Sequence, residues 1–185
     1  MHKSLILVLT LAFCAPAAHA AAQALTPAER AFFDQHISEI VQIEPKRLVD
    51  PALQKVFATP FYEVTVTIRE NNGMNTNTLI AARVGSQLVN ATRPGEDAEL
   101  PDFLKMMNPV FKLATSADAR TLQQALDAAY PILGSDDQKA KTYRRAGNQW
   151  IFVRGVFFDN RQGFVFETDS TGAIVAVKYA LKLPA

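Results

Sequence analysis

The chain has 185 residues, of which 49% are hydrophobic, and its charges nearly balance at 19 Lys and Arg against 18 Asp and Glu. This composition predicts a packed core rather than a disordered chain. It gives no basic excess for nonspecific binding of nucleic acid, so we expect no nucleic-acid partner.

Residues 1–20 have the features of a secretory signal peptide. A short apolar run precedes Ala18-His19-Ala20, the small-x-small pattern that a signal peptidase cleaves before Ala21. The run is too short for a resident membrane helix and no second long run follows, so we expect a soluble periplasmic or secreted protein without a membrane span. Cleavage would remove Cys14, the only cysteine, and would leave a chain without thiol chemistry.

Residues 21–98 are predicted to form an N-terminal α+β half. Thr26-Pro27 with Glu29 is typical of a helix start, and an apolar stripe follows at helical spacing through Phe32, Phe33, Ile37 and Ile40. We expect this helix to end before Pro45 and a short helical turn to begin at Pro51. Alternation then predicts strands over 62–68, 78–84 and 87–92, with a polar connection over 71–77.

The remaining chain is predicted as a helical connector over residues 99–115 and a C-terminal α+β half over 116–185. Thr115 or Ser116 would cap a helix whose apolar stripe is Leu122, Ala125, Leu126 and Ala129. Strands are expected over 150–158, 164–168 and 175–183, with a tight turn at 169–172.

Together these elements predict an α+β protein with helices packed on antiparallel β-meanders. The order of one helix and three strands occurs twice, because residues 62–92 can be laid on residues 150–180. The sequence leaves two arrangements open, one continuous sheet or two similar αβββ subdomains.

Few residues suggest catalysis. His36 is the only histidine after residue 20, and it fits either a general base or a helix face beside Phe32 and Phe33. No nucleophile elbow, glycine-rich phosphate loop or metal-ligand spacing is present, so we expect no cofactor and no metal. A pair of carboxylates that meet only in space would leave no sequence signal.

The densest basic stretch provides the best candidate for an interaction surface. Arg144 and Arg145 follow Tyr143, and Trp150 and Arg154 lie on one face of the next predicted strand. Arginine and aromatic side chains are common anchors of protein interfaces. The alternatives are a solvated loop and, for Arg154, a position at a sheet edge.

Residues 166–177, Phe-Glu-Thr-Asp-Ser-Thr-Gly-Ala-Ile-Val-Ala-Val, resemble the closing hairpin of PepSY-type envelope domains. In those domains an aspartate and a Thr-Gly pair precede the last strand. The resemblance implies a small α+β module of the kind often linked to inhibitory or regulatory roles. It does not extend to the first half of the chain, so no family is assigned from it.

The sequence therefore favours an exported, non-enzymatic binding protein that acts on another envelope or secreted protein as an inhibitor, immunity or accessory factor. One alternative is a small exported hydrolase that uses carboxylates and His36. The other is a carrier that holds an apolar ligand between sheet and helices. The sequence does not define an oligomeric state.

Overall fold

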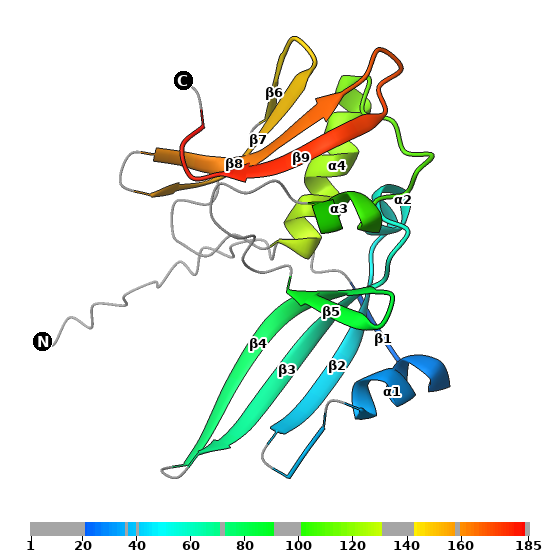
Figure 1. The fold of residues 1–185 in the computed structure, drawn as a ribbon, viewed down its shortest axis with the longest axis vertical. Coiled ribbons are helices and arrows are strands. Elements are labelled where there is room, and N and C mark those ends of the chain that lie inside the picture. The colour runs from blue at the N-terminus through cyan, green and yellow to red at the C-terminus, as the bar shows by residue number, and fades with distance from the viewer. Residues whose placement is uncertain are drawn as a thin grey trace, which may run out of the picture.

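The computed structural model describes residues 21–35, 37–39, 41–70, 73–90, 101–130, 143–157 and 160–183. The described part is mixed α+β, with two antiparallel meander sheets and a few helices (Figure 1). This confirms the predicted α+β class with antiparallel β-meanders. The division into two similar αβββ subdomains stays a prediction. The expected boundaries at 98, 99 and 115 also stay a prediction.

The N-terminal lobe contains a five-stranded sheet in the order β1-β2-β3-β4-β5. Each strand pairs with its sequence neighbour, so short connections build the sheet without a crossover. Its elements are β1 (Ala21–Gln23), α1 (Pro27–Asp34), β2 (Val41–Val49), α2 (Pro51–Val56), β3 (Phe61–Glu70), β4 (Gly73–Val84) and β5 (Gln87–Asn90).

The C-terminal lobe contains a four-stranded sheet in the order β6-β7-β8-β9, which α4 covers on one face. Figure 1 shows α2 and α3 between this sheet and the lower one. The elements are α3 (Pro101–Met106), α4 (Ser116–Ala129), β6 (Tyr143–Ala146), β7 (Gln149–Phe157), β8 (Asn160–Thr168) and β9 (Ile174–Ala180).

The helices begin where the sequence provides caps. Thr26 and Glu29 form a capping box at α1, and Thr115 and Asp118 form a second one at α4. The Asp50 carboxylate caps α2 by accepting from two backbone N–H groups. Each box satisfies N–H groups that a helix end leaves without intrahelical partners, which fixes the first residue of the helix.

One large apolar cluster joins the two lobes. Phe103 of α3 lies near its centre, with ring centroids 5.4 Å from Phe57 after α2 and 5.4 and 5.6 Å from Phe164 and Phe166 of β8. The predicted α4 stripe, Leu122, Ala125, Leu126 and Ala129, is fully buried in the same cluster. The lobes therefore share a core that the hydrophobic effect holds together.

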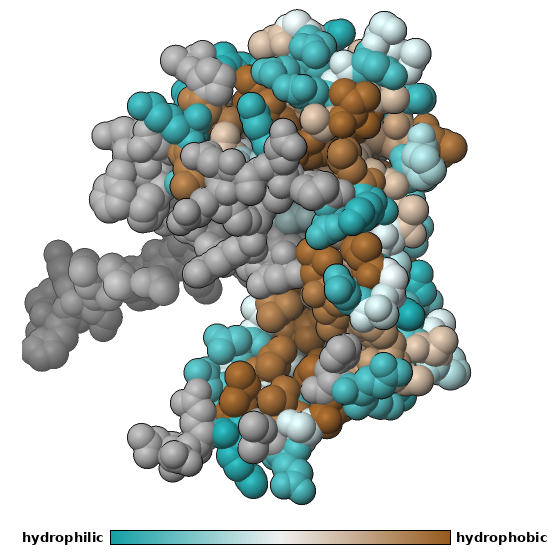
Figure 2. Space-filling view, viewed as in Figure 1, coloured by the Kyte–Doolittle hydropathy of each residue, from teal (hydrophilic) through white to brown (hydrophobic). Residues whose placement is uncertain are grey.

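A second, smaller cluster holds α1 on one face of the N-terminal sheet. Phe32 and Phe33 pack against Tyr62, Val64 and Ala81, and the Phe33 and Tyr62 rings meet edge to face at 4.9 Å. The opposite face carries threonines in its outer part. Figure 2 shows hydrophobic residues gathered on the visible side of this lobe, framed by hydrophilic ones.

Several predicted boundaries were wrong. The first helix ends at Asp34, and Ile37 is 45% exposed rather than part of a buried stripe. Strand β2 occupies Val41–Val49, between the predicted end of that helix and the turn at Pro51, where no strand was predicted, and β4 already begins at Gly73 inside the predicted polar connection. In β9, Val177 is buried as expected, but Val175 is exposed. Ile40 lies outside the described residues.

Candidate functional site

The predicted basic stretch forms strand β6, the edge strand of the C-terminal sheet. Register places Tyr143 opposite Phe152, Arg144 opposite Ile151 and Arg145 opposite Trp150. Tyr143 and Arg145 therefore share the sheet face that α4 covers, while Arg144 lies on the other face. Strand β6 was not predicted, because its four residues are too few to show a period.

Arg145 is held in place from two sides. Its guanidinium carbon lies 5.3 Å from the centroid of the Trp150 ring, and its Nε donates to the Gly147 carbonyl at 3.1 Å. Tyr143 is also anchored, since its hydroxyl donates to the Ser116 carbonyl of α4 at 3.2 Å. Among the described residues the Arg145 guanidinium makes one hydrogen bond, which leaves further N–H donors for a partner.

Arg145 borders a polar cleft of about 640 Å³. The walls are the segment before α4, the turn between β6 and β7, and the turn between β8 and β9. The lining residues are Leu113, Ala114, Arg145, Gly147, Asn148, Thr168, Asp169, Ser170 and Gly172. Hydrogen bonds from Thr171 and from the backbone of Ala173 hold the pKa of the exposed Asp169 below its usual range. The cleft is thus lined by both a fixed cation and an ionised carboxylate.

The other two predicted surface residues are buried. Trp150 is 3% exposed and belongs to the shared core, and Arg154 is 5% exposed. Arg154 forms an ion pair with Asp127 and donates to the carbonyls of Leu126 and Tyr130 at the end of α4. Its charge therefore complements the C-terminal end of that helix, which a cation stabilises.

The arrangement around Arg145 has a counterpart in the other lobe. Arg83 is the penultimate residue of β4, as Arg145 is of β6. Its Nε donates to the Gly85 carbonyl at 3.0 Å, and its guanidinium carbon lies 4.3 Å from the centroid of the Phe32 ring. Both glycines have a positive φ, as such tight hairpins require. The shared sequence Arg-x-Gly-x-Gln at 83–87 and 145–149 is the signal that sequence reasoning missed.

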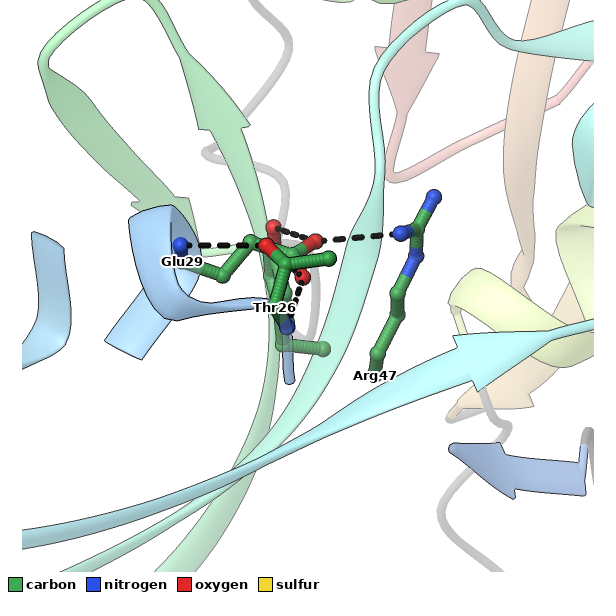
Figure 3. A network of polar contacts seen from close by, with 4 residues as sticks. Thr26, Glu29 and Arg47 are labelled. Carbon is green, nitrogen blue, oxygen red and sulfur yellow. Dashed lines mark hydrogen bonds and ion pairs between the residues drawn. The ribbon is translucent and has the colours of Figure 1, made fainter. Parts of the chain in front are cut away.

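A buried carboxylate connects α1 to its sheet (Figure 3). Glu29 accepts at 2.8 Å from the Tyr62 hydroxyl and from the backbone N–H and hydroxyl of Thr26, and its Oε1 lies 3.3 Å from Arg47 Nη1. Burial alone would raise the pKa of Glu29, but these hydrogen bonds and the Arg47 charge outweigh it and lower the pKa. Burial and the bond to Glu29 raise the pKa of Tyr62.

This network has the properties of a structural anchor. Both Glu29 oxygens already accept hydrogen bonds from Thr26 and Tyr62, and the Arg47 charge adds to them, so the carboxylate fastens the start of α1 to the sheet. The capping box was visible in the sequence, whereas Tyr62 and Arg47 come from strands that only the fold brings to Glu29. His36, the other candidate of the hydrolase hypothesis, lies outside the described residues.

A second cleft, of about 320 Å³, lies beside α2. Leu53, Phe57 and Phe61 provide an apolar part, and Arg47 and Gln54 provide polar groups. Its volume is at the lower end of the range for small-molecule sites.

In the described part of the chain, no helix is long and apolar enough to cross a membrane. No group of three or more His, Cys, Asp or Glu side chains converges there as a metal site would require.

The fold and the site define the chain as an α+β protein with two meander sheets around a shared core and an arginine-bearing edge strand. Comparison with family models, curated proteins and solved structures gave no match.

Proposed function

We propose that the chain is an exported, soluble binding protein that acts on another envelope or secreted protein, as an inhibitor, immunity or accessory factor. The observation that carries this proposal is the fixed position of Arg145 on an exposed edge strand beside a polar cleft. An arginine stacked on a buried tryptophan loses little conformational freedom on binding, which is a property of strong interface anchors.

The chemistry of Arg145 indicates what the partner would present. A guanidinium with free N–H donors binds a carboxylate or a backbone carbonyl, and a carboxylate can take two donors at once. Tyr143, anchored beside it, adds a half-buried aromatic surface. We therefore expect an acidic side chain of the partner to enter the cleft next to Arg145.

Site-specific photo-crosslinking in the organism that encodes the chain tests this proposal. A photoreactive residue in place of Ser170, which is exposed and lines the cleft with Arg145, should yield a covalent adduct with one envelope protein. The Arg145→Ala change should abolish that adduct. Arg83→Ala is the matched control, because it removes the same kind of hydrogen bond and ring contact from the other lobe. Equal adduct yields from both variants would reject the Arg145 surface.

Export rests on residues 1–20, which lie outside the described residues. N-terminal sequencing of the protein recovered from its host should give Ala21 as the first residue. Recovery of an intact N-terminus from the cytoplasm would contradict export.

The carrier hypothesis has one observation in its favour, the mixed cleft beside α2. There an apolar ligand with an acidic end could lie against Phe57 with its charge at Arg47. Native mass spectrometry of protein purified from its host should then detect a bound small molecule. Substitution of Phe57 by a larger or a polar residue should release that molecule.

A further inference from the structure

The outer side of β4 is an open sheet edge. Residues 73–82 of β4 pair with β3, whereas only residues 81–84 pair with β5. Among the residues that the structure describes, no strand pairs with residues 73–79 on the side away from β3. In Figure 1 this stretch forms the outer margin of the N-terminal lobe.

The two open edges of this sheet differ in their protection. On β2, β1 pairs only with residues 47–49, and the open stretch before them contains Glu44, Pro45 and Lys46. Charges and proline are the usual features that keep an edge strand from pairing with another chain. Residues 73–79 contain no charged residue and no proline, although most of their side chains are exposed. This edge therefore retains the ability to pair.

The direction of the backbone groups is set by the strand itself. The Arg83 N–H donates to the Pro60 carbonyl at 3.3 Å, so the odd-numbered residues of β4 direct their N–H and C=O groups toward β3. Because these directions alternate along an antiparallel strand, the groups of Met74, Thr76 and Thr78 point to the open side. A strand added on that side would meet the outward-facing N–H and C=O groups of these three alternate residues.

We propose that two copies of the chain pair antiparallel through this edge, with the two-fold axis at Thr76. Residues 73–79 are centred on this position. The register places Thr76 opposite its own copy, Met74 opposite Thr78, and Asn75 opposite Asn77. Such an isologous contact is the one that closed two-fold symmetry requires. The two hairpins then form one continuous sheet.

The side chains on both faces suit this register. On one face Thr76 lies 3.1 Å from Thr67 by their hydroxyls, and Thr78 lies 3.3 Å from Thr65. Pairing would extend the Thr67–Thr76 contact across the axis to the same residues of the second copy. On the other face the Asn77 amide donates to Asn75 at 3.1 Å, and the register brings the two asparagines of each copy together. Cross-strand pairs of this kind stabilise antiparallel sheets.

The predicted contact is small. It adds about six backbone hydrogen bonds and buries less than the roughly 1,200 Å² typical of stable complexes, so the dimer should form only at high concentration. Its formation does not depend on the surface at Arg145, which lies in the other lobe.

Sedimentation equilibrium and residue-resolved amide exchange test the pairing. The purified protein should show a concentration-dependent dimer, and the amides of Met74, Thr76 and Thr78 should become more protected as concentration rises. The amides of Asn75 and Asn77, which face β3, should not change. Thr76→Lys would place two like charges at the axis and should weaken the dimer about tenfold or more.

Gln42→Lys is the matched control. Gln42 is exposed and lies opposite Thr67, which in turn lies opposite Thr76. The variant therefore adds the same charge to the same face of the sheet, but on β2, two strands away from the β4 edge. It should leave the dimer unchanged. A protein that stays monomeric at millimolar concentration would overturn the proposal and leave the edge to an extended segment of another protein. A dimer that Thr76→Lys and Gln42→Lys affect equally would also overturn it.

Discussion

The Glu29 network allows a quantitative test of how α1 is held on the sheet. Glu29→Gln keeps the shape of the side chain but removes its charge and turns one acceptor into a donor. That donor would face either the backbone N–H of Thr26 or the hydroxyl of Tyr62, both of which donate to Glu29 in the native protein. Charge-assisted hydrogen bonds contribute about 1.5–3 kcal/mol and neutral ones about 0.5–1.5 kcal/mol. The expected loss in free energy of unfolding is therefore about 2 kcal/mol.

Urea and thermal unfolding at pH 7 measure this loss. For a protein of this size about 2 kcal/mol corresponds to a decrease in Tm of roughly 4–8 °C. Glu39→Gln is the matched control, because Glu39 is exposed, and it should change stability by less than about 0.5 kcal/mol. If both variants unfold at the same urea concentration, the network does not anchor α1.

The same pair of variants predicts a pH dependence. The pKa of Glu29 is lowered in the folded protein, so its contribution to stability is complete above the ordinary glutamate value of about 4.3. It is lost as the pH falls through that value toward the folded-state pKa. The stability difference between the native protein and Glu29→Gln should therefore shrink in acid and stay constant between pH 6 and 8. A difference that grows on acidification would contradict the assigned direction.

Two further substitutions test the C-terminal lobe. Arg154→Met should lower the free energy of unfolding by about 2–3 kcal/mol in urea titrations, because it removes the ion pair with Asp127 and the hydrogen bond to the Tyr130 carbonyl. An unchanged midpoint would show that Arg154 does not cap α4. Gly163→Ala should prevent stable folding, since its Cβ would lie 1.9 Å from the Phe152 carbonyl oxygen. A native-like circular dichroism spectrum and melting temperature for Gly163→Ala would refute that contact.

The sequence predicted the elements whose signals are local. Capping residues such as Thr26 and Thr115 lie within one turn of the helix that they start, so their role can be recognised without the fold. The apolar stripe of α4 has a clear period and was correctly assigned to the core. Strand β2 was missed because Pro45 normally argues against a strand, although a proline is tolerated where one side of the strand is open.

The candidate site could be predicted only in part. Arg145 and Tyr143 were chosen by residue type. The hydrogen bond and ring contact that fix Arg145 depend on the hairpin between β6 and β7, which was not predicted because β6 is too short to show a period. Arg154 was placed on the correct face of its strand, yet its burial depends on the end of α4, more than twenty residues earlier in the chain. No local pattern carries that information.

The central claim is that Arg145 anchors a partner protein at the edge of the C-terminal sheet. Once photo-crosslinking has identified that partner, isothermal titration of the purified pair measures the claim directly. We expect Arg145→Ala to weaken binding about thirtyfold, the factor that an interface anchor of about 2 kcal/mol provides. Arg83→Ala should bind like the native protein. Native affinity in Arg145→Ala, or an equal loss in both variants, would contradict the claim.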